Sequence, residues 1–88
     1  MKHNSRQKKS LFHRRTQLPL FVEKDEDGFY VVECPLFAGC YTQGRTLDTA
    51  LENIKDVIAL LVAEAGNRKI LKSYALQPRE FSLHTIAL

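Results

Sequence analysis

Apolar and polar residues alternate from residue 17 onward, and this pattern predicts a β-strand with one buried face. The side chains expected to face the core are those of Leu18, Leu20 and Val22. Pro19 lacks a backbone N–H and cannot donate a hydrogen bond to a neighbouring strand. We therefore expect this strand to start late or to leave one side unpaired at that point.

A polar turn over residues 24–28 follows, and Gly28 is the residue suited to a positive φ angle. The turn leads into a second β-favouring run over 29–34, so the two runs predict a hairpin. Glu33 is expected to face water, which fixes the alternation of the whole strand. The side chains that then point inward are Tyr30, Val32 and Cys34.

Pro35 ends the second strand, and a short link containing Gly39 leads to a third strand over residues 40–43. Gly44 ends that strand. Three successive strands with short connections predict an antiparallel meander.

The hydrophobic period then changes to that of an amphipathic helix over residues 46–65. Thr46 is a suitable N-cap, and Asp48 places a negative charge in the first turn, where the helix dipole favours it. Gly66 and Asn67 are typical of a left-handed C-cap. The apolar stripe consists of Leu47, Ala50, Leu51, Ile54, Val57, Ile58, Leu61, Val62 and Ala65. The helix needs a cover, and the meander is the candidate large enough to provide it.

The rest of the chain is expected to be a connection over 66–77, a break at Pro78 and a last strand over 80–87 that joins the sheet. The sequence therefore predicts an α+β fold, a two-layer β-β-β-α-β arrangement in which one helix packs on one face of an antiparallel sheet. Residues 17–88 form the single domain of this prediction. Residues 1–16 form a basic arm with too few apolar residues for a packed element.

Charge is distributed unevenly between these two parts. The arm carries six basic residues and no acid, whereas the domain carries seven basic and ten acidic residues. The bases of the arm are Lys2, Arg6, Lys8, Lys9, Arg14 and Arg15. Such an arm can bind nucleic acid or an acidic partner, and it can equally be a solvated extension without a specific role.

No catalytic constellation is visible in the sequence. His3 and His13 lie in the arm, where nothing fixes their geometry, and His84 alternates within the expected last strand. The acids of the 24–28 turn lack the spacing of a calcium loop, and no glycine-rich phosphate loop is present. We therefore predict a non-enzymatic protein without a cofactor or a metal.

Cys34 and Cys40 are interpreted as reduced core residues at strand ends, because their spacing matches neither a zinc knuckle nor a redox motif. A metal site formed with His13 is the minor alternative. The longest apolar run, 57–63, is too short to cross a bilayer, and the polar start shows no signal peptide. These features predict a cytoplasmic protein.

Three segments in order resemble the HicB-like antitoxin family. They are an acidic turn with glycine and aromatic residues at 24–32 (KDEDGFYVV), a proline link to Gly-Cys at 35–40 (PLFAGC), and a helix entry at 42–47 (TQGRTL) followed by Ala-Leu at 50–51. The turn and cap positions of this motif are Gly28, Pro35, Gly39, Gly44 and Thr46. The resemblance covers close to half of the chain.

The resemblance implies a fold that is partly ribonuclease-H-like or similar to a double-stranded-RNA-binding domain, without nuclease function. It also implies a dimer that covers a small basic ribonuclease toxin, HicA. Many members repress their operon through a separate C-terminal DNA-binding domain. Only about 22 residues follow the predicted helix here, too few for such a domain, so we do not expect operator binding by that route.

The main hypothesis is thus a protein-binding module that sequesters a small basic toxin or another protein partner. Acidic residues along the hairpin would attract such a partner. They are Glu23, Asp25, Glu26, Asp27 and Glu33. The alternative is a non-specific nucleic-acid binder that uses the basic arm. Unpaired sheet edges favour self-association in either case, and we expect a homodimer, or else a tetramer.

Overall fold

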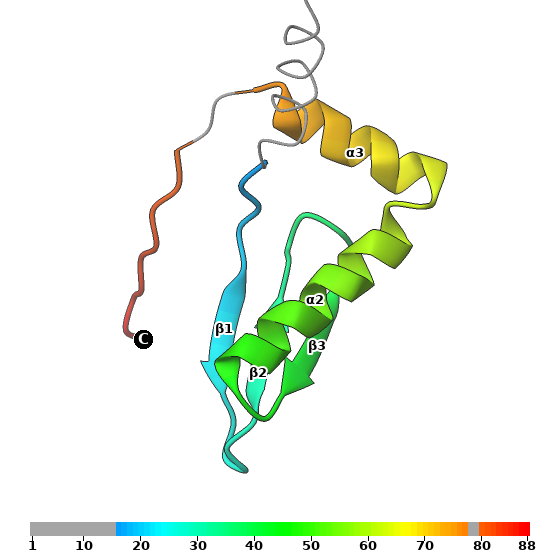
Figure 1. Cartoon of the computed structure of the whole chain (residues 1–88). Coiled ribbons are helices and arrows are strands. Elements are labelled where there is room, and N and C mark those ends of the chain that lie inside the picture. The colour runs from blue at the N-terminus through cyan, green and yellow to red at the C-terminus, as the bar shows by residue number, and fades with distance from the viewer. Residues whose placement is uncertain (1–15, 78–79) are drawn as a thin grey trace, which may run out of the picture.

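A computed structural model describes residues 16–77 and 80–88 of the chain. Its sheet contains β1 (Phe21–Lys24), β2 (Tyr30–Glu33) and β3 (Tyr41–Gly44), paired antiparallel in the order β1-β2-β3. Two helices, α2 (Leu47–Leu61) and α3 (Ala65–Ala75), follow the sheet (Figure 1). The predicted α+β class and the antiparallel meander are confirmed.

The strand register assigns each side chain to one of two faces. Val32 lies opposite Val22 on one side and Thr42 on the other, so these three residues share a face. Val32 and Cys34 are fully buried on this face, as the alternation predicts. Glu33 is exposed on the opposite face.

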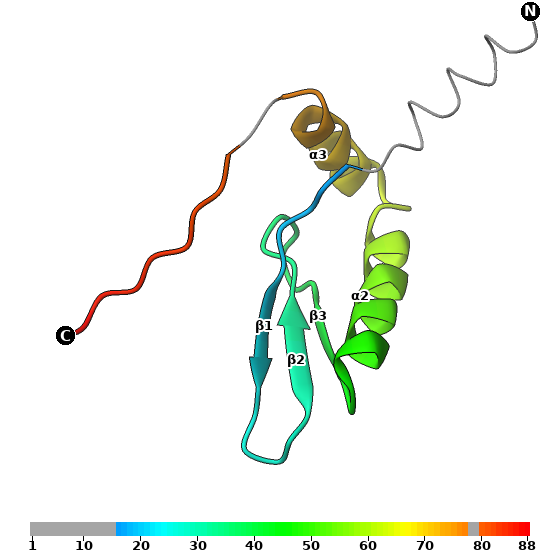
Figure 2. The same cartoon turned by 60° about the vertical axis from the view of Figure 1, so that its left-hand side comes forward.

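β1 begins at Phe21, four residues after the predicted start, because Pro19 precludes earlier pairing on one side. The upstream residues Leu18 and Leu20 are nevertheless partly buried against the core. Val22 remains 41% exposed, although its side chain points to the buried face. The cause is the position of α2, which packs across β3 and β2 and leaves β1 at the margin (Figure 2).

The hairpin turn is held by one side chain. The backbone N–H of Asp27 and the backbone N–H of Phe29 each donate to Oδ1 of Asp25 at 2.9 Å. Gly28 has φ 89°, the positive value for which glycine was predicted. The tip of the hairpin therefore has a defined conformation beyond the end of the sheet.

α2 begins where the sequence places it. Oγ1 of Thr46 accepts a hydrogen bond from the backbone N–H of Thr49 at 3.0 Å, which is the predicted N-cap. A Cβ atom added at Gly44 would lie 2.6 Å from the backbone nitrogen of Ala50, so the absence of a side chain there allows the first turns of α2 to approach β3 closely. The buried cluster beneath the helix consists of Val32, Cys34, Phe37, Cys40, Ala50 and Ile54.

The predicted end of this helix at 65–67 is wrong. α2 ends at Leu61, and the segment expected to be a connection is the helix α3, which includes Gly66. The amide of Asn67 donates to the carbonyl of Leu61 at 2.9 Å, and the guanidinium of Arg68 donates to the carbonyl of Ala63 at 2.9 Å. Side chains of the second helix thus satisfy carbonyl groups at and just after the end of the first, and the chain bends between them.

The predicted last strand over 80–87 is also wrong. Residues 80–88 have no regular secondary structure, and none of them pairs with a strand of the described sheet. The ring of Phe81 stacks on Tyr74 of α3 with ring centroids 6.3 Å apart. This contact holds the start of the segment against α3 instead of the sheet edge, and both views show the remainder running clear of β1 (Figures 1 and 2).

Candidate partner-binding surface

The face of the sheet opposite α2, which we call the open face, carries the side chains that the core does not use. They are Phe21, Glu23, Val31, Glu33, Tyr41 and Gln43. None of the helices in the described part of the chain packs on this face (Figure 2). It is therefore a surface available to another molecule.

One row of the open face places a carboxylate between two aromatic rings. Glu33 of β2 lies opposite Phe21 of β1 and opposite Tyr41 of β3. Phe21 is 52% exposed and Tyr41 is 65% exposed. Aromatic residues are enriched where proteins bind one another, because a ring buries a large area at a low cost in side-chain entropy.

The next row adds a second carboxylate. Glu23 lies opposite Val31, one step along the sheet from Glu33, so the two acids are diagonal neighbours. Both are exposed. Neither acid forms an ion pair with any of the described residues. The ion pair found among these residues joins Glu52 and Lys55 on α2. The open face thus presents two negative charges that no neighbouring base neutralises.

The three other predicted acids lie at the hairpin tip and have different roles. Asp25 holds the turn through its two backbone hydrogen bonds. Glu26 and Asp27 are exposed, and their carboxylates have no recorded partner in the described structure. Of the five acids proposed from sequence, four are therefore free to meet a partner and one is required by the fold.

Two bases near the sheet are engaged with rings. Nζ of Lys24 lies 5.2 Å from the centre of the Tyr30 ring, and the guanidinium of Arg45 lies 5.3 Å from the centre of the Phe29 ring. Both cations lie over aromatic rings, and neither forms an ion pair with a carboxylate of the open face.

Cys34 and Cys40 are opposite each other where β2 and β3 meet the 35–39 link. The backbone N–H of Cys34 donates to the carbonyl of Cys40 at 2.9 Å, and both residues are buried and free. Burial raises the pKa of the Cys40 thiol, and the adjacent Cys34 adds to that rise. The thiol of Cys40 is therefore protonated and a poor nucleophile at neutral pH.

No metal-binding cluster is found within residues 16–77 and 80–88, where no three His, Cys, Asp or Glu side chains converge. His84 shares a hydrogen bond of 2.8 Å with Oγ of Ser82 on the C-terminal segment, away from the cysteines. His13, the third ligand of the alternative metal site, lies outside the described residues.

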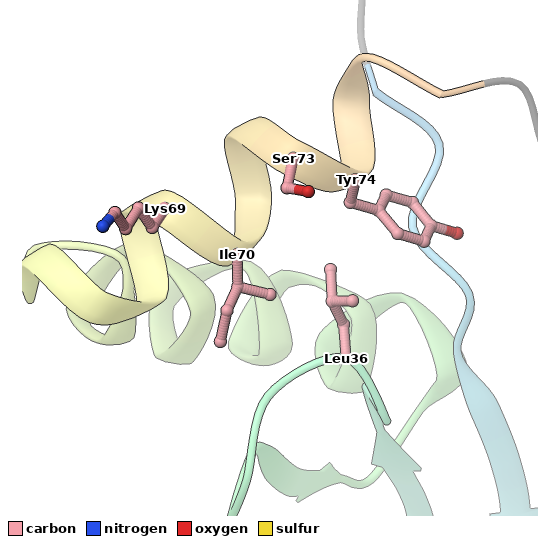
Figure 3. A pocket seen from close by; sticks show the side chains of 5 residues that line it. All are labelled: Leu36, Lys69, Ile70, Ser73 and Tyr74. Carbon is pink, nitrogen blue, oxygen red and sulfur yellow. The ribbon is translucent and has the colours of Figure 1, made fainter.

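A hollow of about 560 Å³ lies between α3 and the 35–39 link. Figure 3 shows Ile70 pointing down from α3 and Leu36 pointing up from the link. The residues that line it are Leu36, Lys69, Ile70, Ser73 and Tyr74. Sequence reasoning missed this hollow because it missed α3, although the four-residue spacing of Ile70 and Tyr74 was a helical signal.

The predicted nucleic-acid-binding residues of the arm lie outside the described residues. Among the bases after α2, Arg68 is engaged with backbone carbonyls at the bend between the helices. In the part of the chain that the structure describes, no helix has the length and apolar character needed to span a membrane.

Fold and surface together define a small α+β domain whose sheet is covered by a helix on one side and open on the other. The family model described as HicB_like antitoxin of bacterial toxin-antitoxin system matches residues 18–77. The chain belongs to this family.

Several curated relatives carry the name UPF0150 protein. One from Thermoplasma acidophilum is 40% identical over 67 residues, which cover 74% of this chain and 93% of the relative. One from Archaeoglobus fulgidus is 49% identical over 48 residues, covering 54% of this chain and 70% of the relative. One from Synechocystis is 44% identical over 45 residues, covering 51% and 65%. No solved structure matches the chain significantly.

Proposed function

We propose that this chain is an antitoxin that neutralises a small basic ribonuclease toxin of the HicA type by binding it through the open face and the hairpin tip. The observation that carries the proposal is the exposed row Phe21–Glu33–Tyr41. Membership of the HicB-like antitoxin family supports a toxin as the partner.

The chemistry of a ribonuclease explains why such a surface suits it. A toxin that binds RNA needs cationic side chains for the phosphates, and carboxylates can occupy those cations in place of phosphate. Glu23 and Glu33 on the open face, with Glu26 and Asp27 at the tip, supply four such groups. Phe21 and Tyr41 supply apolar anchors that displace water around them. Neutralisation by this route needs no catalytic group in the antitoxin.

The direct test is binding of the full chain to a purified toxin of the HicA type, with isothermal titration calorimetry for the affinity and stopped-flow mixing for the association rate. Tyr41→Thr should weaken binding by about tenfold or more, because truncated aromatic anchors at interfaces typically lose that much. Glu33→Gln should slow association most strongly at low salt, since it removes a steering charge and keeps the side-chain shape.

Glu52→Gln is the matched control for Glu33→Gln. It also removes one exposed carboxylate, but on the solvent side of α2. Its affinity should stay within about twofold of the parent, since a single remote surface charge contributes little in high dielectric. Equal losses for Glu52→Gln and Glu33→Gln would show that only net charge matters and would overturn the assignment of the open face.

The alternative function, non-specific nucleic-acid binding by the arm, is a separate proposal that the described residues do not address. It predicts an affinity for DNA or RNA that falls steeply with salt and disappears when residues 1–16 are deleted. Fluorescence anisotropy with a labelled oligonucleotide distinguishes it, because toxin binding through the open face should survive the same deletion.

A further inference from the structure

The free edge of β1 and the C-terminal segment 80–88 are both unpaired parts of the same fold. β1 is a terminal strand of the sheet, with β2 as its only neighbour among the described strands. An edge strand presents a row of backbone donors and acceptors that a further extended segment can satisfy. Residues 80–88 are extended and make no backbone hydrogen bond within the described structure.

The side chains of this segment are unusually apolar for an exposed one. Leu83 is 80% exposed and Ile86 is 81% exposed, and Phe81 and Leu88 are also exposed. Such a concentration of exposed apolar side chains typically marks an interface. The sequence of the segment favours a strand, with Thr85 and Ile86 β-branched and Phe81 aromatic. The segment thus has the composition of a strand and lacks a strand partner.

An apolar groove separates the segment from the margin of the sheet in its own molecule. Leu20 and Phe21 line one side of this groove, Phe81 and Leu83 line the other, and its volume is about 470 Å³. The stacking of Phe81 on Tyr74 fixes the start of the segment on the far side of the groove. The segment therefore stands beside the edge of its own β1 without reaching it.

The margin of the sheet at β1 also lacks a cover. α2 packs on β3 and β2, so Val22 stays 41% exposed on the face that is otherwise core. A strand added at this edge would bring alternate side chains over Val22 and Leu20. Phe81 and Leu83 are two residues apart and can lie on one face of such a strand, while Ser82 and His84 lie on the other.

We propose that residues 80–88 of one copy enter the groove of a second copy and pair with the free edge of its β1. The exchange is reciprocal, so two segments lie side by side between the two β1 strands in one continuous sheet. Each copy brings one unpaired segment and one unpaired edge, and a pair of copies satisfies both. The dimer uses the backbone edge of β1, whereas the toxin is proposed to bind the side chains of the open face, and the two surfaces meet at Phe21. The dimer is therefore tested on the chain alone, without a toxin.

The oligomeric state of the full chain is the first measurement, by sedimentation velocity from about 1 to 100 µM, the range in which weak dimers dissociate. The variant His84→Pro/Thr85→Pro removes the N–H of two successive residues, one facing the partner's β1 and the other facing the neighbouring segment. Its dimer dissociation constant should rise by about tenfold or more, because the ladder bond is lost in both halves of the exchange. The control His84→Ala/Thr85→Ala keeps both N–H groups and should change the constant by less than about threefold.

Cross-linking distinguishes exchange from closure on the same chain. A chain carrying Val22→Cys is mixed with one carrying Leu83→Cys and treated with a short bismaleimide, to which the buried Cys34 and Cys40 present no accessible thiol. Exchange yields a cross-linked pair of chains in the mixture. Three outcomes would each overturn the proposal. The chain could remain monomeric at about 100 µM, or the proline pair could leave the dimer dissociation constant unchanged. Cross-links could also form only within a chain that carries both cysteine substitutions.

Discussion

The two faces of the sheet are made by the same three strands and yet have opposite characters. On the face under α2, Val32, Cys34 and Cys40 are almost completely buried and contact the helix. On the open face, Phe21, Glu33 and Tyr41 lie in an exposed row on which no helix of the described chain packs. The difference teaches that stability resides on one side of the sheet and that the other side is free for recognition.

The largest effect is expected at the centre of the covered face. Ile54 is 1% exposed and belongs to the buried cluster. Ile54→Ala should lower the free energy of unfolding by about 3 kcal/mol, since it removes buried carbon atoms and leaves a cavity that the neighbours fill only in part. Urea denaturation followed by circular dichroism measures it. A loss below about 1 kcal/mol would mean that α2 packs on the sheet less tightly than described.

A smaller loss is expected where the helix approaches the sheet. In Gly44→Ala the new Cβ would meet the backbone of Ala50 and Thr49 at 2.6 to 3.0 Å. Backbone atoms cannot rotate away, so α2 must shift, at a cost of about 2 kcal/mol. Gly66→Ala is the matched control, because nothing lies within 4 Å of its Cβ position and its φ is not positive. The control should be neutral or slightly stabilising within a helix.

The N-cap of α2 comes next. Thr46→Ala removes the acceptor for the N–H of Thr49 and should cost about 1 kcal/mol. Thr46→Ser keeps the hydroxyl and should recover most of this loss. The same urea titration reports both variants, and equal losses for alanine and serine would assign the effect to the methyl group instead of the cap.

The smallest change in stability is expected on the open face. Tyr41→Thr alters an exposed residue on an edge strand and replaces one strand-favouring side chain with another, so the free energy of unfolding should change by less than about 0.5 kcal/mol. The same variant is expected to weaken toxin binding strongly. If Tyr41→Thr destabilised the fold as much as Ile54→Ala, the division of labour between the two faces would be wrong.

Local signals explain why the first part of the domain could be predicted from sequence. The alternation around Val32, the turn at Gly28 and the cap at Thr46 each depend on residues close together in the chain. The end of α2 depends on contacts that periodicity does not encode. The Gly66-Asn67 pair is typical of a helix stop, but the side chain of Asn67 reaches back to the carbonyl of Leu61 from within a second helix.

The candidate site was predictable to a similar degree. Alternation indicated that Glu33 faces water, but only the register across the strands places it between Phe21 and Tyr41. Sequence also gave no means of separating Asp25, which holds the turn, from the exposed Glu26 beside it. The β-favouring composition of 80–87 indicated a strand, and composition alone does not supply a partner for it.

The close approach at Gly44 has a consequence for how this domain can diversify. Almost no added atom fits where α2 meets β3, whereas Phe21, Glu33 and Tyr41 on the open face are exposed. Substitutions at Phe21, Glu33 and Tyr41 can therefore change what this surface binds without disturbing the packing of the helix on the sheet. Binding specificity can therefore change through surface substitutions alone, because these residues do not take part in the packing of α2 on the sheet.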